Sequence, residues 1–387
     1  MNIAEKIPLI VGALLHDIGK VVYRAGESSE RHAISGAAYL RDTARISSKD
    51  ILDCVRYHHA VDLKGADLAS KNPAYIVYMA DNIASGVDRR EQESDAKGFD
   101  KNLPLASIFN LLNGNSGKNA YDPRKTNVEE AVNFPLENAA PFDASAYRKI
   151  LADITDSLKG IEWGVGANGA PCASAEYVNS LLEVLDSHLS FVPSSTNLQE
   201  AADISLFNHV KLTAAFASAI ADYLEEKGDS DYKQTLFVNG QSFYEEKAFL
   251  LTVLDLSGIQ KFIYTIHSED ALKNLRARSF YLDFMTEHIA SCLLKELSLT
   301  RANLLYSGGG RADLLLPNTV KTKEALTDFQ KRVNAWFLQN MGIALYLAMG
   351  YANASMKDLR DEPAGSYAEL HRQRGSAIAG DKSCRYG

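Results

Sequence analysis

The residue types that could do chemistry gather near the N-terminus, where histidines and aspartates recur. An apolar run ends at His16-Asp17, and Ile, Gly and Lys20 follow this pair. Four further candidates lie downstream: His32, His58, His59 and Asp81. Neutral imidazole and carboxylate ligands suit borderline divalent metals such as manganese, iron, nickel or cobalt. One or two such ions can activate water and clamp a phosphate, which is the chemistry of phosphodiester hydrolysis.

Helix geometry allows these side chains to share one cavity. Adjacent helical residues lie about 100° apart, so both His16 and Asp17 can edge a common site. The same holds for His58 and His59, of which one would bind metal and the other would face phosphate. Asp81 comes from a separate predicted helix and would bridge or cap the site. A chance dipeptide among surface histidines is the alternative, and the later residues at this spacing argue against it.

The overall composition bounds the class of protein. The 387 residues are 46% hydrophobic and 23% charged, which is ordinary globular composition and enough for two or three domains. No apolar run reaches the roughly 18 residues of a membrane span, and the apolar N-terminal stretch lacks a basic leader. We therefore expect a cytoplasmic protein with no membrane partner. Four scattered cysteines without a Cys-x-x-Cys pair suit a reducing compartment and indicate no zinc knuckle.

The charge balance limits how the chain can meet nucleic acid. The formal net charge is −8, so phosphate contacts must come from local basic patches or from bound metal. Lys20 is one candidate for such a contact, and a solvated surface role is its alternative.

The first 240 residues have the periodicity of an all-α region. Helices are predicted over 3–22, 35–45, 50–59, 74–87, 144–158, 175–189 and 209–226. Residues 86–141 are rich in Asn, Gly, Asp and Lys, which predicts a long surface excursion with a short helix over 105–112. Residues 228–241 are predicted to form a linker or an exposed loop.

From residue 248 the pattern changes to alternating strands and helices. The near-continuous apolar run 249–254 predicts a buried central strand. The elements predicted after it are helices over 259–267 and 271–297, strands over 303–306 and 313–316, a helix over 321–341, a strand over 343–351 and a short helix over 367–374. This order predicts a ferredoxin-like α/β layer.

Two motifs in this second region suit a nucleotide. Asp255 ends the first strand, and Ser257-Gly258 lead into a helix whose free amides could face a phosphate. A glycine hairpin would allow a ligand to approach the backbone closely, and its residues are Gly308, Gly309 and Gly310. Each motif alone is a weak signal, because an aspartate at the end of a strand is structural as often as functional and a glycine triplet is usually just a turn.

The first set of motifs resembles a known superfamily. Leu-His-Asp-Ile-Gly-Lys with a later His, His-His and Ala-Asp is similar to the HD superfamily of metal-dependent phosphohydrolases. Most members carry a further histidine upstream, and here residues 203–215 resemble that missing first helix. This order resembles the circularly permuted HD domain of the large subunit of type III CRISPR effector complexes. His209 would then complete the pocket, or it would serve its own helix structurally.

The second set of motifs resembles the same subunit. Residues 255–263, 275–282 and 304–318 are similar to the first palm domain of the type III-A (Csm subtype) large subunit. The resemblance implies a multidomain chain, in which an all-α permuted HD domain precedes an α/β ferredoxin-like palm domain. The implied boundaries are 1–90 for the HD core, 91–240 for its helical remainder with the permuted helix over 201–226, 245–360 for the palm, and 361–387 for the start of a linker. The chain would be an N-terminal portion of the subunit, from a truncated or split gene.

The resemblance also implies an activity and partners. In the family, the HD domain cleaves single-stranded DNA, and paired palms convert ATP with magnesium into cyclic oligoadenylate when target RNA is bound. The implied roles are metal ligation by the six histidines and aspartates, catalysis by His16, Asp17 and Lys20, and nucleotide binding by the palm motifs. The implied partners are single-stranded DNA, the CRISPR RNA-containing ribonucleoprotein with its other protein subunits, and target RNA indirectly.

One departure restricts these implications. The palm hairpin reads Gly-Gly-Gly-Arg and lacks the acidic pair that holds two magnesium ions for nucleotidyl transfer. We therefore expect no cyclase activity from this chain alone, and a second palm would have to complete the ATP pocket.

Two other functions remain open. One is a phosphohydrolase of small or cyclic nucleotides with the palm as a nucleotide sensor, which the choice of substrate would distinguish. The other is a scaffold with a vestigial HD site, which would purify without stoichiometric metal.

Overall fold

The chain forms two compact units. The computed structural model describes residues 2–88, 90, 97–112, 117–126, 132–165, 171–264 and 270–385. The helical unit comprises residues 2–217 and 230–239, and the sheet unit comprises residues 218–229 and those from 240 onward. Within the described residues, no helix is both long enough and apolar enough to cross a membrane.

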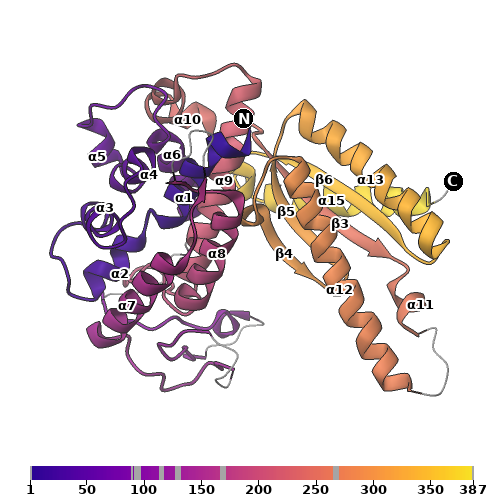
Figure 1. The fold of residues 1–387 in the computed structure, drawn as a ribbon, viewed down its shortest axis with the longest axis horizontal. Helices are drawn as coiled ribbons and strands as arrows, with labels where there is room; N and C mark the ends of the chain where they lie inside the picture. The colour runs from indigo at the N-terminus through magenta and orange to yellow at the C-terminus, as the bar shows by residue number, and fades with distance from the viewer. Residues whose placement is uncertain are drawn as a thin grey trace. The chain divides into compact units, whose positions relative to one another are not determined.

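The helical unit is organised around one almost wholly buried helix. Its helices are α1 (Ile3–Leu15), α2 (Ile18–Arg24), α3 (His32–Asp42), α4 (Lys49–Arg56), α5 (Ala60–Lys64), α6 (Ala74–Asp88), α7 (Ala144–Gly160), α8 (Ala175–Leu189) and the first half of α9 (Leu206–Glu226). Helix α1 lies among α4, α6 and α8 (Figure 1). Apolar side chains on all faces of α1 are buried. A helix that is hydrophobic all round must be covered on all sides, so α1 forms the core of this unit.

Short elements complete the helical unit. They are the 3-10 turn η1 (Ile108–Asn110), the two-stranded ribbon of β1 (Gly164–Val165) and β2 (Pro171–Cys172), and the π-helix η3 (Lys233–Val238).

Three helix predictions were wrong, and the first two of them bear on the site. The helix predicted over 3–22 is interrupted by a turn at His16-Asp17, because α1 ends at Leu15 and α2 begins at Ile18. Apolar residues continue on both sides of this turn and are buried in both helices, which is why periodicity hides the break. The helix predicted over 50–59 ends at Arg56, and that predicted over 105–112 is reduced to η1.

The sheet unit contains one antiparallel sheet of four strands. They are β3 (Phe249–Ser257), β4 (Leu304–Gly308), β5 (Arg311–Pro317) and β6 (Tyr346–Ala354), in the order β4-β5-β3-β6. Strand β3 lies between β5 and β6, and it pairs with β6 over its whole length and with β5 from Phe249 to Asp255. The helices of this unit are α10 (Gly240–Phe243), α11 (Ile259–Tyr264), α12 (Ala271–Glu296), α13 (Val320–Met341), α14 (Met356–Leu359) and α15 (Ser366–Ser383), with the 3-10 turn η4 (Arg301–Asn303).

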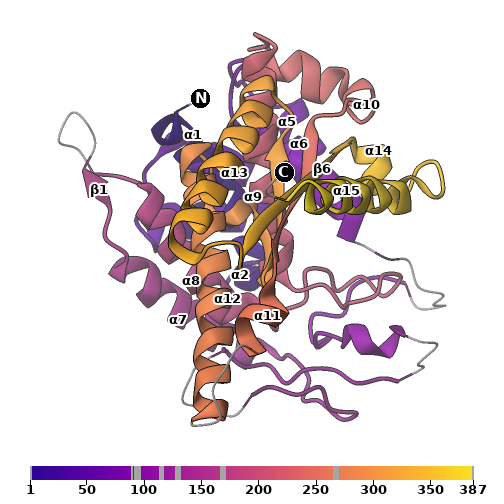
Figure 2. The ribbon, with the colours of Figure 1, turned by 90° about the vertical axis from the view of Figure 1, so that its right-hand side faces the viewer.

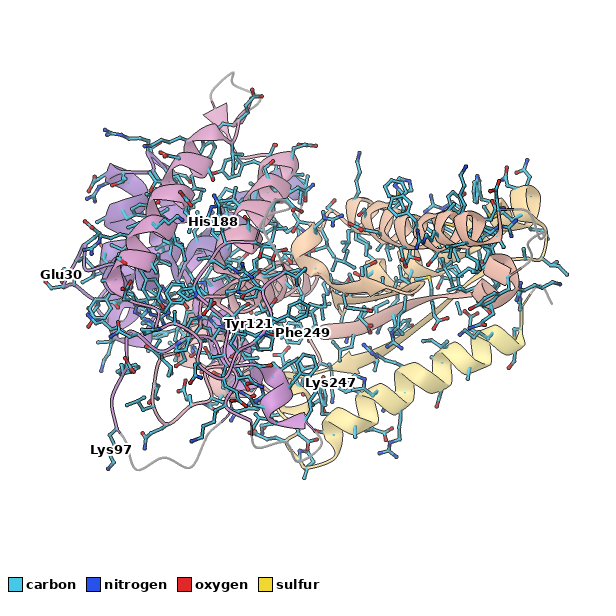
Figure 3. All side chains as sticks on the ribbon, turned by 90° about the horizontal axis from the view of Figure 1, so that it is seen from below. Glu30, Lys97, Tyr121, His188, Lys247 and Phe249 are labelled. Atoms are coloured by element: carbon cyan, nitrogen blue, oxygen red, sulfur yellow. The ribbon has the colours of Figure 1, made fainter. Side chains whose placement is uncertain are left out.

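Helices cover both faces of this sheet. Leu250 and Leu254 of β3 pack in one apolar cluster with α12 and α13, while Val253 points to the other face and joins Ile378 of α15. Figures 1 and 2 show α15 along the strands, and Figure 3 shows α12 on the opposite side of them. Helix α15 comes close because Gly350 has no side chain, since a Cβ there would lie 2.8 Å from the Arg374 carbonyl oxygen. The helix predicted over 367–374 thus continues to Ser383 as a full layer.

Side chains of β3 alternate between the two faces of the sheet, and this alternation predicts which substitution destabilises the sheet unit. Leu254 is fully buried under α12 and α13, so Leu254→Ala should cost about 2–5 kcal/mol of unfolding free energy. Leu305 of β4 is 36% exposed, and Leu305→Ala in the same sheet is the matched control. Hydrogen exchange of the β3 and β5 amides measures the effect, and equal protection in both variants would contradict this packing.

Candidate metal centre

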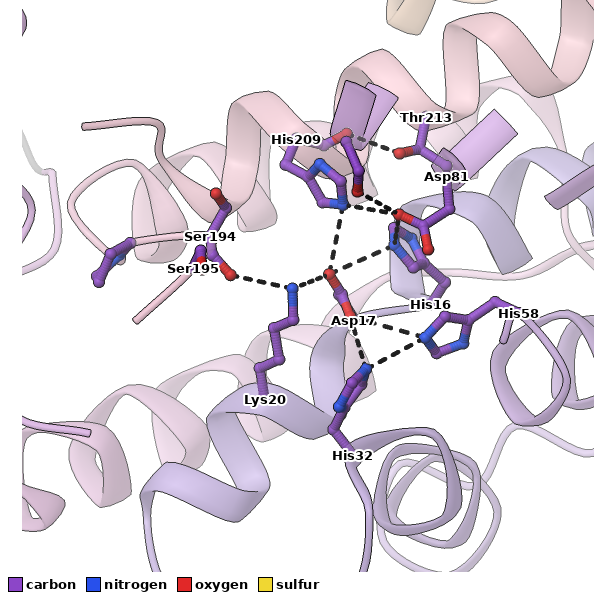
Figure 4. Close-up of polar contacts among 12 residues, drawn as sticks. His16, Asp17, Lys20, His32, His58, Asp81, Ser194, Ser195, His209 and Thr213 are labelled. Carbon is purple, nitrogen blue, oxygen red and sulfur yellow. Dashed lines mark hydrogen bonds and ion pairs between the residues drawn. The ribbon is translucent and has the colours of Figure 1, made fainter. Parts of the chain in front are cut away.

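Six predicted ligands and one further histidine meet in the helical unit. The turn between α1 and α2 supplies His16 and Asp17, and Figure 4 shows side chains from other helices pointing toward this pair. The other residues of the group are His32 at the start of α3, His58 and His59 between α4 and α5, Asp81 in α6, and His209 in α9.

One oxygen of Asp17 faces α9 and α6. Its Oδ2 atom lies 3.4 Å from Nε2 of His16, 3.4 Å from Nε2 of His209 and 2.6 Å from Nζ of Lys20. The Asp81 Oδ1 atom lies 3.6 Å from the same nitrogen of His16 and 3.2 Å from that of His209. Two imidazole nitrogens and two carboxylates therefore surround one small space.

The other oxygen of Asp17 faces three histidines. Its Oδ1 atom lies 3.3 Å from Nε2 of His32 and 3.8 Å from Nε2 of His58. The His32 Nε2 atom is in turn 3.3 Å from Nε2 of His58 and 2.8 Å from Nε2 of His59. Asp17 thus belongs to one group of possible metal ligands, His16-Asp17-His209, and borders a second group, His32-His58-His59. Within each group the ligand atoms lie within 4.8 Å of one another.

Backbone carbonyl acceptors fix the orientation of two rings. Nδ1 of His16 lies 2.7 Å from the Ala13 carbonyl oxygen, and Nδ1 of His58 lies 2.7 Å from that of Val55. A carbonyl can only accept, so each Nδ1 carries a proton and each Nε2 faces Asp17. Whenever such a ring is neutral, its lone pair is therefore on Nε2 and available to a metal ion. This arrangement, with Nδ1 held by an outer acceptor, is typical of metal-binding histidines.

The unsatisfied atoms of the site fit a cation. Nε2 of His16 and Nε2 of His209 are buried and make no hydrogen bond, although carboxylate oxygens lie within 3.6 Å. Such orphaned buried nitrogens are costly in a folded protein. Imidazole nitrogens and carboxylate oxygens aimed at one point are the donor set that borderline divalent metals prefer. The residues present therefore fit a divalent metal ion.

In the absence of a metal ion, protonated histidines supply the positive charge that balances the buried carboxylates. Burial disfavours a charged ring, but the carboxylates of Asp17 and Asp81 raise the pKa of His16 to about 9. Burial is likewise outweighed at His209, whose pKa is raised well above its usual range by Asp17, Asp81 and Asp88. Burial would raise the pKa of Asp17, but Lys20 and His16 hold it well below its usual range. The two carboxylates stay ionised and require a cationic partner.

The second group of histidines behaves differently. Burial and the neighbouring rings His59 and His16 hold the pKa of His58 well below its usual range. Burial and His32 lower the pKa of His59 in the same way. Neutral rings offer the free lone pairs that a metal requires.

Two expectations about individual residues need correction. His58 and His59 do not lie on a helix, since α4 ends at Arg56. Both rings belong to one group of possible metal ligands, and the division of the two rings between metal and phosphate stays a prediction. Lys20 is not solvated, because its Nζ is paired with Asp17 and donates to the Ser194 carbonyl oxygen at 3.0 Å. Its side chain is 14% exposed.

Comparisons with known proteins match both units. A family model of the HD domain matches residues 1–86, and a model of Csm1 subunit domain B matches residues 248–387. The chain is 44% identical over 390 residues to the CRISPR system single-strand-specific deoxyribonuclease Cas10/Csm1 (subtype III-A) of Streptococcus thermophilus, and 40% identical over 420 residues to that of Mycobacterium tuberculosis. Each alignment covers 99% of this chain and 50% of the relative. The chain belongs to the Cas10/Csm1 family of subtype III-A.

Solved structures of this family have the same fold. A crystal structure of a Csm1-Csm4 cassette in complex with pppApA matches all of this chain and 50% of its own, with a TM-score of 0.76 and 28% identity. The cassette in complex with one ATP matches with a TM-score of 0.74 and 27% identity, over 49% of its chain. The chain therefore spans about half the length of the relatives it matches.

The predicted nucleotide residues meet at one end of the Csm1 domain B sheet. Leu256 donates its backbone N–H to the Gly310 carbonyl oxygen at 2.8 Å, which brings the glycine hairpin beside the end of β3. Gly258 has φ +95°, and a Cβ there would lie 2.0 Å from the Ala344 carbonyl oxygen. Asp255 is paired with Lys382 of α15 at 2.7 Å. A role in binding nucleotide stays a prediction for Asp255, Ser257, Gly258, Gly308, Gly309 and Gly310.

One residue of the metal centre was missed by sequence reasoning. Asp88 accepts from Nδ1 of His209 at 2.8 Å and so orients the ring of α9. The HD-domain match ends at residue 86 and includes neither of these residues. A signal for Asp88 was available, because residues seven apart share one helix face and Asp81 already pointed to that face.

Gly19 explains why glycine follows the His-Asp pair. A Cβ at this position would lie 1.8 Å from the His32 carbonyl oxygen and 2.8 Å from the Gly36 nitrogen. The close approach of α2 and α3 at this point therefore requires glycine at Gly19 and Gly36, and it brings His32 near Asp17.

We predict that Gly19→Ala separates α2 from α3. Overpacking should lower the unfolding free energy by about 1–3 kcal/mol and reduce bound metal. Gly160→Ala at the end of α7 is the control, because its Cβ would meet open space. Urea unfolding and elemental analysis measure both quantities, and a Gly19→Ala protein with wild-type metal content would contradict the packing argument.

Asp88 should act on metal affinity through His209. We predict that Asp88→Ala weakens metal binding about 10- to 100-fold, as the loss of outer hydrogen-bond partners does elsewhere. Asp88→Asn keeps an acceptor oxygen and should recover most of that loss. Isothermal titration with Mn²⁺ measures the affinity, and equal affinities for wild type and Asp88→Ala would contradict the role.

Proposed function

We propose that the helical unit is a metal-dependent nuclease that cleaves single-stranded DNA. The observation that carries this proposal is the position of Asp17, with one oxygen toward each ligand group and with orphaned imidazole nitrogens beside it. Relatives at 44% and 40% identity are named single-strand-specific deoxyribonucleases, which supports the choice of substrate.

The residues divide into two sets around Asp17. His16, Asp17, Asp81 and His209 would hold one divalent ion, and His32, His58 and His59 would hold a second beside the other oxygen of Asp17. Manganese, nickel or cobalt suits this mixed donor set. When bound, such ions lower the pKa of water and neutralise phosphate charge.

Other groups of the chain orient the ligand side chains and keep Asp17 ionised. Asp88 orients His209, and the Ala13 and Val55 carbonyls orient His16 and His58. Lys20 pairs with the Asp17 Oδ2 atom and donates to the Ser194 carbonyl oxygen, and its charge keeps the Asp17 carboxylate ionised. We propose that Lys20 also contributes positive charge toward the bound phosphodiester.

We further propose the finer architecture of each unit. Return of α9 to the site, with His209 at its start, supports an HD domain that is circularly permuted. The connection β3-helices-β4-β5-α13-β6 and the antiparallel order β4-β5-β3-β6 support a ferredoxin-like palm.

The palm would serve a different reaction in a longer protein. Solved relatives are titled as complexes with ATP, pppApA and cA4, which supports a nucleotide role for this domain. The hairpin Gly308-Gly309-Gly310-Arg311 has no acidic pair. We propose that the palm binds ATP with magnesium only together with a second palm, and so contributes to cyclic oligoadenylate synthesis.

The same relatives suggest the assembly. They are titled as Csm1-Csm4 complexes, one of them within the type III-A CRISPR-Csm interference complex. We propose a Csm4-like subunit and a CRISPR RNA-containing ribonucleoprotein as partners, with target RNA acting indirectly.

Cleavage of labelled single-stranded DNA tests the nuclease. With manganese, nickel or cobalt added, wild type should cut linear and circular strands, and His16→Ala/Asp17→Ala should lose about 10²-fold or more of this activity. His371→Ala/Asp328→Ala removes the same residue types from the sheet unit and should leave activity unchanged.

Two outcomes would contradict the proposal. Equal cutting by wild type and the His16→Ala/Asp17→Ala variant would place the activity elsewhere. Stoichiometric metal with no DNA cleavage, but with hydrolysis of small or cyclic nucleotides, would instead support a small-nucleotide phosphohydrolase.

A further inference from the structure

Two arginines converge on one buried carboxylate beside the histidine group. Arg31 donates from both terminal nitrogens to Asp62, at 3.1 Å and 2.7 Å. Arg56 donates to the same carboxylate at 2.6 Å. The Asp62 side chain is 2% exposed, whereas that of Arg31 is 54% exposed and that of Arg56 is 30% exposed. We call these three residues the arginine clamp.

Each residue of the clamp is close in the chain to a histidine of the candidate metal centre. Arg31 immediately precedes His32, and Arg56 stands two residues before His58. Asp62 lies in the first turn of α5, where its N–H donates to the His59 carbonyl oxygen at 3.0 Å. The clamp therefore lies next to His32-His58-His59, the group whose His32 ring is 26% exposed.

The arginine clamp carries a net positive charge. One carboxylate balances one guanidinium, so two arginines around Asp62 leave a net positive charge. Within the described part of the chain, Asp62 is the only carboxylate paired with Arg31 or Arg56. A guanidinium has five N–H donors, and Arg31 uses two of its own while half of its side chain faces solvent. The clamp thus keeps oriented donors free in a protein of net charge −8.

We propose that the arginine clamp binds a backbone phosphate of the single-stranded substrate next to the phosphate that is cleaved. This inference rests on the nuclease function proposed above. A guanidinium fork matches the oxygens of a phosphate, and Asp62 orients the Arg31 fork before substrate arrives. Arg56 is further held over the Tyr57 ring, with Cζ at 5.1 Å from its centroid. Contacts to the backbone give affinity without reading the base sequence.

Binding of fluorescent oligothymidine to the full chain tests the clamp. Anisotropy is measured in EDTA, which prevents cleavage, over a range of KCl concentrations. Arg31→Gln and Arg56→Gln should each weaken binding about three- to tenfold. The salt dependence should also fall, by about 0.7 in the slope of log K against log salt for each lost phosphate contact. Arg31→Lys keeps the charge without the fork and should recover part of the affinity.

Matched controls separate this role from a structural brace. Arg41→Gln removes an exposed arginine from the far end of α3, where it pairs with Asp42, and should bind as wild type. Hydrolysis of bis(p-nitrophenyl) phosphate with manganese should be unchanged in Arg31→Gln, because this diester has no neighbouring phosphate. A structural brace would instead lower metal content, unfolding free energy and small-diester hydrolysis together.

The two proposals fail in different measurements. Wild-type affinity and salt slope in Arg31→Gln and Arg56→Gln, or no binding of oligothymidine by wild type, would overturn the clamp. Absence of metal-dependent DNA cleavage by the wild type would overturn the nuclease, whatever the anisotropy shows.

Discussion

The candidate metal centre depends on the burial of one carboxylate, Asp17. A buried carboxylate is tolerated only if cationic or hydrogen-bonding groups surround it. Here that requirement brings four segments to one point, because side chains from α2, α3, the α4–α5 connection and α9 all reach Asp17. The break between α1 and α2 turns Asp17 into this space, and the contact between Gly19 and the His32 carbonyl brings α3 close enough to reach it. The apolar helix α1 provides the rigid support for this arrangement.

The same residues link metal binding to the stability of the helical unit. Protons on His16 and His209 balance the carboxylates in the metal-free protein, and a divalent ion would replace them. An ion that binds only the folded site stabilises the fold by mass action. Since His209 lies in α9 and Asp81 lies in α6, metal bound between them would also hold α9 against α6. The HD-domain match and the geometry of the site thus both indicate a metal-binding domain. The match itself ends at residue 86, before α9 begins.

The sequence predicted the parts of the fold that local patterns determine. Most helices and the four strands of the sheet followed from periodicity and turn residues, and they were found within a few residues of the expected places. The six residues predicted as ligands lie around one site, and metal ligation by them stays a prediction. The break at His16-Asp17 was not predictable, because both flanking helices are buried and keep one continuous apolar pattern. The grouping of His58 with His59, the pair of Asp88 with His209, and the convergence of Arg31 and Arg56 on Asp62 are all tertiary contacts. No local pattern specifies which distant segments meet, so these became visible only in the fold.

The most direct test of this account is anomalous diffraction from crystals soaked in Mn²⁺, with wild type compared with Asp17→Asn. We expect two manganese peaks in wild type, one beside His16 and His209 and one beside His32, His58 and His59, with Asp17 between them. Asp17→Asn should lose at least one of the two peaks. No peak at either group, or two undiminished peaks in Asp17→Asn, would contradict the claim that this carboxylate organises the centre.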